Sequence, residues 1–254
     1  DYVFSDAEDK DALDEAAAKL RDTKITQPAV LTVNVALTRL LASYGIVPDM
    51  VIGHSLGEYA ALVAAGVMTL ADALHVVSAR GREMSKVSVE DNGCMAAIFA
   101  PLPEVERVLA QVPGYAVLAN INSTNQVVIG GETKAIDDAI AIFRQADYRA
   151  VKIPVSHAFH TRIVAPASEP LKRVISNMDI RSPQVPIVAN VTGELYPQTP
   201  SGIVDILGRQ VASPVQFVKG VQTLYREGAR VFVEFGPKRV LKPLAGDIVQ
   251  DRDE

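Results

Sequence analysis

The pattern of apolar and polar positions divides the chain into alternating helices and strands. Apolar residues recur at helical spacing in some segments, and shorter β-branched runs bounded by turn-forming residues favour strands. Strands separated by helices indicate a mostly parallel sheet with helices on both faces. Outside residues 92–153 the pattern predicts helices at 11–19, 29–44, 59–67, 70–85, 163–178 and 215–226 and after Gly236-Pro237, and strands at 50–53, 185–191 and 230–235.

Residues 92–153 follow a different pattern. Strands are predicted at 95–100, 115–121, 126–129 and 149–155, and helices at 103–112 and 133–145. The resulting order, βαββαβ, is that of a ferredoxin-like unit. We therefore expect an α/β protein in which a small ferredoxin-like subdomain, residues 92–153, is inserted into a large subdomain formed by residues 1–91 and 154–254.

The helix predicted at 29–44 is the most apolar of the set. It starts at Thr26-Gln27-Pro28, where a threonine can cap the helix and a proline fits the first turn, and it stops at Gly45. Apolar residues occupy most of its faces, so we expect it to be covered on more than one side. Polar residues interrupt the apolar stretch, which predicts a buried helix and no membrane span.

Composition narrows the classes of function. The 254 residues are 48% hydrophobic and 22% charged, as in a globular protein with a large core. A net charge of −5 argues against a nucleic-acid surface or an anionic membrane as partner. With Cys94 as the only cysteine, no internal disulfide can form, and the acidic N-terminus does not resemble a signal peptide. We therefore expect a cytoplasmic protein.

Candidate chemistry begins at Gly53-His54-Ser55-Leu56-Gly57, which lies between a short apolar strand and an alanine-rich helix. The spacing is G-x-S-x-G, typical of a serine nucleophile on a tight strand-to-helix turn. We expect glycine at both flanking positions because a side chain there would clash as the backbone reverses. Such a turn exposes the serine Oγ and places backbone N–H groups of the helix start beside it.

A second cluster, Ser156-His157-Ala158-Phe159-His160, follows the last strand of the small subdomain. It holds two of the four histidines, and a serine nucleophile needs a base, which is usually histidine. The residues alone leave open whether one of these histidines is that base or is structural. A metal pair is disfavoured because no set of Cys, His and carboxylate residues at ligand spacing accompanies them.

Three segments together resemble the malonyl-CoA:acyl carrier protein transacylases, and most of all the acyltransferase domains of polyketide and fatty-acid synthases. They are Gly-His-Ser-Leu-Gly-Glu at 53–58, His-Ala-Phe-His at 157–160, and Asn-Ile-Asn-Ser-Thr-Asn-Gln-Val-Val-Ile-Gly-Gly at 120–131. The resemblance runs from Thr26 to about Leu244. It implies an α/β-hydrolase-like large subdomain beside the ferredoxin-like small one.

The resemblance implies roles for individual residues. Ser55 matches the nucleophile, His160 the base, and Leu56 the donor of one oxyanion N–H. Arg80 matches the arginine that pairs with the malonyl carboxylate, and a backbone carbonyl near Gln210 would orient the histidine in place of an aspartate. Further positions implied to line or approach the substrate site are Gln27, Asn120, His157, Phe159 and Gln210.

The implied reaction moves a malonyl unit from CoA to the phosphopantetheine thiol of an acyl carrier protein through a malonyl-serine ester. It needs no metal and no bound cofactor, since malonyl-CoA is the substrate and phosphopantetheine belongs to the carrier protein. A ketosynthase in the same polypeptide is a further expected partner. The family also begins with a strand ending in Gly-Gln-Gly-Ser-Gln, which supplies the second oxyanion N–H. The sequence given starts downstream of where this motif should lie; if the segment is truly absent, a core strand and half of the oxyanion hole are lost.

The run 157–160 also bears on the extender unit. In the resembling synthase domains His-Ala-Phe-His accompanies malonyl-CoA, whereas Tyr-Ala-Ser-His accompanies methylmalonyl-CoA. Phe159 would fill the space that a C2 methyl group needs, which favours malonyl; as an ordinary core residue it would leave methylmalonyl or another acyl group open.

Two other classes of function compete with the acyltransferase. A serine hydrolase or thioesterase of the lipase or patatin type shares the Ser55 turn, but it would need a carboxylate partner for the histidine and gives no reason for Arg80. A non-catalytic docking domain within a synthase is the second alternative.

Overall fold

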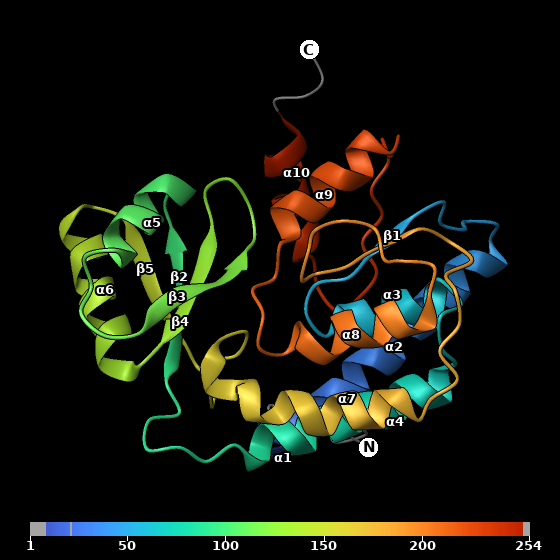
Figure 1. Ribbon diagram of the computed structural model, residues 1–254, viewed down its shortest axis with the longest axis horizontal. Helices are drawn as coiled ribbons and strands as arrows, with labels where there is room; N and C mark the ends of the chain where they lie inside the picture. Colours follow the sequence, from blue (N-terminus) through green and yellow to red (C-terminus); the bar gives the residue numbers. More distant parts are fainter. Residues whose placement is uncertain (1–8, 21, 251–254) are drawn as a thin grey trace.

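Two sheets of different type organise the chain in the computed structural model, which describes residues 9–20 and 22–250 (Figure 1). A parallel pair joins β1 (Val51–Ile52) to β6 (Ile187–Val188), with Val51 opposite Ile187. An antiparallel sheet has the strand order β3-β4-β2-β5. The predicted α/β fold with a parallel and a ferredoxin-like part is therefore confirmed.

The antiparallel sheet lies within residues 92–153. Its elements are β2 (Cys94–Phe99), α5 (Leu102–Leu109), β3 (Ala116–Ile121), β4 (Val127–Gly131), α6 (Thr133–Gln145) and β5 (Arg149–Ile153). Successive side chains of a strand point to opposite faces. Cys94, Ala96 and Ile98 of β2 therefore pack with the buried residues of α5 and α6, whereas Met95 packs on the other face with Ala158 from the large part. That second face of the sheet turns toward the site described below.

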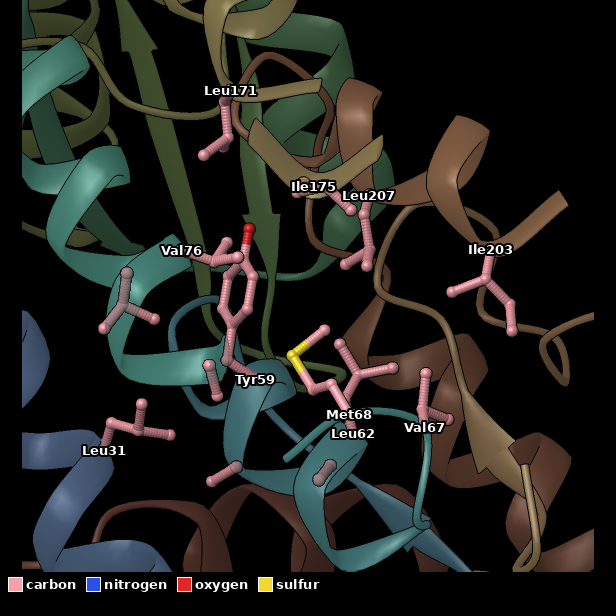
Figure 2. Close-up of a cluster of buried hydrophobic side chains, with 14 of the residues drawn as sticks. Leu31, Tyr59, Leu62, Val67, Met68, Val76, Leu171, Ile175, Ile203 and Leu207 are labelled. Atoms are coloured by element: carbon pink, nitrogen blue, oxygen red, sulfur yellow. The ribbon is translucent and has the colours of Figure 1, made fainter. Parts of the chain in front are cut away.

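Helices surround the parallel pair in the large part (Figure 1). They are α1 (Lys10–Lys19), α2 (Thr23–Ser43), α3 (Gly57–Ala64), α4 (Leu70–Lys86), the 3₁₀ segment Arg162–Ala167, α7 (Ser168–Ser176), α8 (Pro200–Gln210), α9 (Phe217–Arg226) and α10 (Leu241–Val249). The short helix α3 is apolar on nearly every side, which requires burial all round. Figure 2 shows Tyr59 and Leu62 of α3 pointing among side chains of α4, α7 and α8, and both are 0% exposed. Packing on several sides fixes the helix that follows Ser55.

The helix α2 differs from its prediction at both its start and its burial. Asp22 caps it by accepting from Lys24 N–H at 2.9 Å, so the helix begins before Pro28 and contains it. Its buried residues are Gln27, Leu31 and Val35, which form one stripe at i, i+4 spacing. The expectation of cover on more than one side is wrong, because the buried residues of α2 all lie on this one face.

By length and composition α2 is also the one helix in the described ranges that could cross a membrane. Core helices of soluble proteins pass the same test.

Four other segments depart from the sequence prediction. The strand predicted at 230–235 is wrong: no described segment pairs with its backbone, and Val231 is 83% exposed. The strand predicted at 185–191 shrinks to Ile187–Val188, since only these residues pair with β1. The helix predicted at 163–178 divides into the 3₁₀ segment, which contains Pro166, and α7. Helix α8 was not predicted, because Pro197, Pro200 and Gly202 suggest a loop.

Candidate active site

Ser55 occupies a tight turn between β1 and α3. Its φ of 52° lies in the left-handed region, which is unusual for a residue with a side chain. A Cβ atom at Gly53 would lie 2.2 Å from Glu58 N and from Gly57 O, so the predicted need for glycine holds there. At Gly57 the same prediction is wrong, because a Cβ would meet nothing within 4 Å.

This asymmetry gives a prediction about stability. Gly53→Ala should destabilise the fold by about 1–3 kcal/mol or more, because the new methyl group meets backbone atoms that cannot rotate away. Gly57→Ala is the matched control and should be neutral or slightly stabilising, because the position opens α3 and alanine favours helices. Urea unfolding of both variants tests this. Equal losses of stability would contradict the geometry.

Asn190 secures the strained turn from the neighbouring segment after β6. Its Oδ1 accepts from Ser55 N–H at 2.6 Å, and its Nδ2 donates to Gly53 O at 2.6 Å. The Asn190 side chain thus forms hydrogen bonds with the residues on both sides of His54. Asn190 was not a sequence-predicted site residue, although an amide at the end of an apolar predicted strand was an available signal.

His160, the predicted base, lies against Ser55, the predicted nucleophile. Its Nε2 is 2.7 Å from Ser55 Oγ, and its Nδ1 is 3.1 Å from both Gln210 O and Ser213 O. Carbonyl oxygens only accept, so Nδ1 carries the proton and Nε2 is free to accept from the serine hydroxyl. In the described part of the chain no carboxylate contacts this ring.

The electrostatic setting keeps His160 neutral. Burial, followed by the nearby charge of Arg80, lowers the pKa of His160 to about 3. The ring is therefore unprotonated at neutral pH, which is the form that can take a proton from Ser55. A serine–histidine pair oriented by main-chain carbonyls can support nucleophilic catalysis on an acyl group.

Leu56 is the predicted donor of one oxyanion N–H. It is the N-cap residue of α3, and within the described ranges no acceptor takes its N–H. The first N–H groups of a helix lack partners inside the helix and point toward negative charge. This donor lies directly after the nucleophile.

Arg80 lies on α4 and is 4% exposed. Its Nη1 donates to Gln27 Oε1 at 2.9 Å, and Gln27 Nε2 contacts Met84 Sδ at 3.8 Å. No ion pair with Arg80 occurs among the described residues, and its Nε has no partner there. Burial lowers the pKa of Arg80, but guanidinium stays charged at neutral pH. A buried cation with unused donors is suited to an anionic ligand.

A cavity of about 340 Å³ joins these groups between the two parts of the chain. Its lining combines polar and apolar side chains. Its lining comprises Thr23, Thr26, Gln27, His54, Ser55, Arg80, Met84, Met95, Asn120, Val128, Ile153, Val155, Phe159 and His160. The volume is in the range of small-molecule sites.

The remaining sequence-predicted residues fall into two groups. Asn120, beside a bulge in β3, and Phe159 both line the cavity. His157 does not: its Nε2 contacts Val87 O and its Nδ1 contacts Ser156 Oγ, each at 2.9 Å, so its ring joins two loops. Gln210 supplies its carbonyl to His160, and its side chain points to Ser55 O, not to the cavity.

His54 is a cavity residue that the sequence analysis did not single out. Its Nε2 lies 2.7 Å from Asn122 Oδ1, which links the Ser55 turn to the small part, and burial lowers its pKa. In the described ranges no three His, Cys or carboxylate residues cluster as metal ligands would. The cavity therefore brings together a serine hydroxyl, a neutral imidazole, a buried guanidinium and apolar side chains.

Comparison with known proteins agrees with this geometry. The Acyl transferase domain family matches residues 5–250. The chain is 36% identical over 233 residues to the malonyl CoA-acyl carrier protein transacylase of Bacillus subtilis, covering 90% of the chain and 73% of that protein. It is 39% identical to the PKS-NRPS hybrid synthetase ATPKS of Aspergillus niger, covering 89% of the chain but only 12% of the synthetase.

Solved structures show the same fold. The acyl-carrier-protein S-malonyltransferase of Burkholderia pseudomallei matches with a TM-score of 0.88 and 37% identity, over 91% of this chain and 77% of that one. The acyltransferase domain from the second module of the salinomycin polyketide synthase matches with a TM-score of 0.84 and 35% identity, over 93% of this chain and 55% of that one. The chain therefore belongs to the acyl transferase domain family of enzymes.

Proposed function

We propose that this chain transfers a malonyl unit from CoA to the phosphopantetheine thiol of an acyl carrier protein. The observation that carries the proposal is the buried, unpaired Arg80 in the same cavity as Ser55 and His160. A guanidinium fork matches a carboxylate in bidentate fashion, and malonyl-CoA bears a carboxylate next to its thioester. Relatives whose names include malonyl transfer support the choice of acyl group.

The residues divide the reaction into two steps. His160 Nε2 takes the proton of Ser55 as Oγ attacks the thioester carbonyl, and Leu56 N–H stabilises the oxyanion. CoA leaves as the thiol with the proton returned by His160. The carrier's thiol then attacks the malonyl-serine ester, His160 accepts the thiol proton, and Ser55 regains its hydrogen. No resident cofactor or metal enters either step.

The partners follow from this chemistry. The second substrate is an acyl carrier protein, and a ketosynthase in the same polypeptide is the further partner that the multidomain polyketide synthases among the relatives suggest. Fatty-acid and polyketide assembly both use such a transfer. We place the reaction in the cytoplasm.

Labelled malonyl-CoA tests the proposal directly. The protein, in its full natural length, should gain label on Ser55 and pass it to a phosphopantetheinylated carrier protein faster than to water. Release mainly to water would favour the hydrolase alternative. Absence of label on Ser55 would favour the docking domain.

Phe159 leads to a prediction on the extender unit. It is partly buried and packs against the cavity wall near His160, where its ring can exclude a C2 methyl group. An apolar pocket discriminates one methyl group by about 1–3 kcal/mol. We therefore expect malonyl-CoA to outcompete methylmalonyl-CoA by at least about tenfold, and Phe159→Ser to narrow the ratio.

A competition assay with both CoA esters measures this ratio in a single tube. Phe143→Leu, in the core of the small part, serves as a control because that ring lies outside the cavity lining. If the wild type prefers methylmalonyl-CoA, the predicted malonyl specificity is wrong, but the proposal that the protein is an acyltransferase is unaffected.

A further inference from the structure

Glu58 is a completely buried carboxyl group that the two-step reaction does not use. It lies in the first turn of α3, three residues after Ser55, and is 0% exposed. Among the described residues no cation forms an ion pair with it. A charged group is rarely buried in this way without a specific set of partners.

The partners of Glu58 are all donors. Oε1 accepts from Asn190 N–H at 2.9 Å and from Tyr196 O–H at 2.6 Å, and Oε2 accepts from Gln210 Nε2 at 2.7 Å. A carboxylate accepts on both oxygens, whereas an amide accepts on one and donates from the other end. Burial raises the pKa of Glu58, while these donors and the charge of Arg80 oppose the rise.

Two of these partners, Gln210 and Asn190, also form hydrogen bonds with the Ser55–His160 pair. Gln210 Nε2 also donates to Ser55 O at 2.9 Å, and the main-chain carbonyl of Gln210 accepts from His160 Nδ1 at 3.1 Å. Asn190 uses its side chain to hold Gly53 O and Ser55 N–H. The carboxyl group therefore joins the residue that orients the base to the residue that holds the nucleophile's backbone.

We propose that Glu58 is a positioning residue of the Ser55–His160 pair and acts through Gln210 and Asn190. The proposal rests on the serine chemistry of the proposed function. In this role the Glu58 carboxylate holds Gln210, whose main-chain carbonyl orients His160. The carboxylate itself does not touch the imidazole. The strained backbone at Ser55, with φ 52°, and at His160, with φ 60°, needs such external restraint.

Glu58→Gln is the principal test, measured on the protein in its full natural length. An amide accepts at one end only, so the NH2 group of the new side chain would face either Gln210 Nε2 or Asn190 N–H and weaken one of these two links. Misplacement of a reacting group by about 1 Å can slow a reaction roughly 10²-fold. We expect the maximal rate of Ser55 acylation by malonyl-CoA to fall about 10²-fold, with the half-saturating concentration changed less than about threefold.

Phenylmethylsulfonyl fluoride gives a second readout that is independent of malonyl-CoA. Ser55 Oγ bonds to its sulfur, fluoride leaves, and His160 takes the serine proton, so the rate reports on the pair alone. We expect the same slowing with this reagent. If wild-type protein reacts with the sulfonyl fluoride but not with malonyl-CoA, the proposed function fails and the role of Glu58 is still tested.

A double-mutant cycle separates positioning from simple packing. Gln210→Met removes the side-chain donor and keeps the main-chain carbonyl, so it should slow acylation to a similar extent. The double variant should then be slowed by clearly less than the product of the two single effects, because the two side chains share the contact between Glu58 Oε2 and Gln210 Nε2. Multiplied effects of the two changes, near 10⁴-fold, would overturn the proposal.

Thr223→Val provides the structural control. It removes the buried hydrogen bond that Thr223 Oγ1, on α9, donates to Gly193 O. Neither residue bonds to Glu58, Gln210 or Asn190, so the variant should lower Tm while leaving the acylation rate within about twofold. Where Glu58→Gln does not fold, Tyr196→Phe removes one donor to Oε1 and should slow acylation about threefold to tenfold. A lowered Tm without slower acylation in either network variant would overturn the proposal.

Discussion

Ser55→Ala is expected to abolish covalent labelling by malonyl-CoA, and His160→Ala to slow it by roughly 10³-fold or more. Ser55 Oγ and His160 Nε2 are 2.7 Å apart, and the tautomer fixed by the carbonyls of Gln210 and Ser213 leaves Nε2 ready to accept the hydroxyl proton. Because the two residues act as one proton-transfer unit, the double variant should be no worse than Ser55→Ala.

His157→Ala is the matched control for this prediction. The ring of His157 is also buried, but it contacts Val87 O and Ser156 Oγ and lies outside the cavity lining. It should affect labelling far less than His160→Ala, although Tm falls. Intact-protein mass spectrometry after a timed exposure to malonyl-CoA measures each rate. If His157 were indispensable and His160 dispensable, the base would be wrongly assigned.

The sequence predicted Ser55 and His160 as a pair, and the structure brings their side chains within 2.7 Å, but it did not predict which residues hold them in place. Ser55 was predictable because the turn is local and its glycine at 53 leaves a recognisable spacing. His160 lies over a hundred residues later, and only the family resemblance distinguished it from His157. The distinction is a matter of ring contacts, which periodicity and spacing do not encode.

Local pattern also explains which parts of the fold were predicted. Side chains of the strands in the small part point alternately to two packed faces, as Cys94, Met95 and Ala96 of β2 do. This alternation can be recognised in the sequence. Residues 230–235 have the composition of a strand, but pairing depends on a neighbouring backbone that composition cannot supply. Helix α8 was not predicted because proline usually indicates a loop. Proline is nevertheless compatible with the first turn of a helix, where α8 has it.

Glu58 and Asn190 mark the limit of sequence reasoning about the site. Each is a polar residue in an apolar stretch, which is a signal of some role. Which role depends on partners more than a hundred residues away, such as Asn190 N–H on Glu58 Oε1. The contacts of these two residues form only when folding brings together the segments that contain Glu58, Asn190 and Gln210.

Arg80→Ala is expected to remove malonyl transfer selectively. The Arg80 guanidinium donates to Gln27 Oε1, lines the cavity, and forms no ion pair with any carboxylate of the described residues. A hydrogen bond to a charged group contributes about 1.5–3 kcal/mol, and leaving the malonyl carboxylate buried without a partner adds to the loss. We expect kcat/KM for malonyl-CoA to fall at least about 10²-fold, while acetyl-CoA is used as well as before or better.

The ratio of malonyl to acetyl transfer is the quantity to measure, because Arg80 also lowers the pKa of His160. Any effect of the substitution on the base acts on both substrates and cancels in the ratio. Arg82→Ala, on an exposed arginine two residues along the same helix, should leave the ratio unchanged. The ratio for Arg80→Lys should fall between the ratios of the wild type and of Arg80→Ala, since lysine keeps the positive charge but cannot bind a carboxylate in the bidentate geometry of a guanidinium. Equal losses for both acyl groups in Arg80→Ala would mean that Arg80 supports the fold of α4 and does not select the substrate.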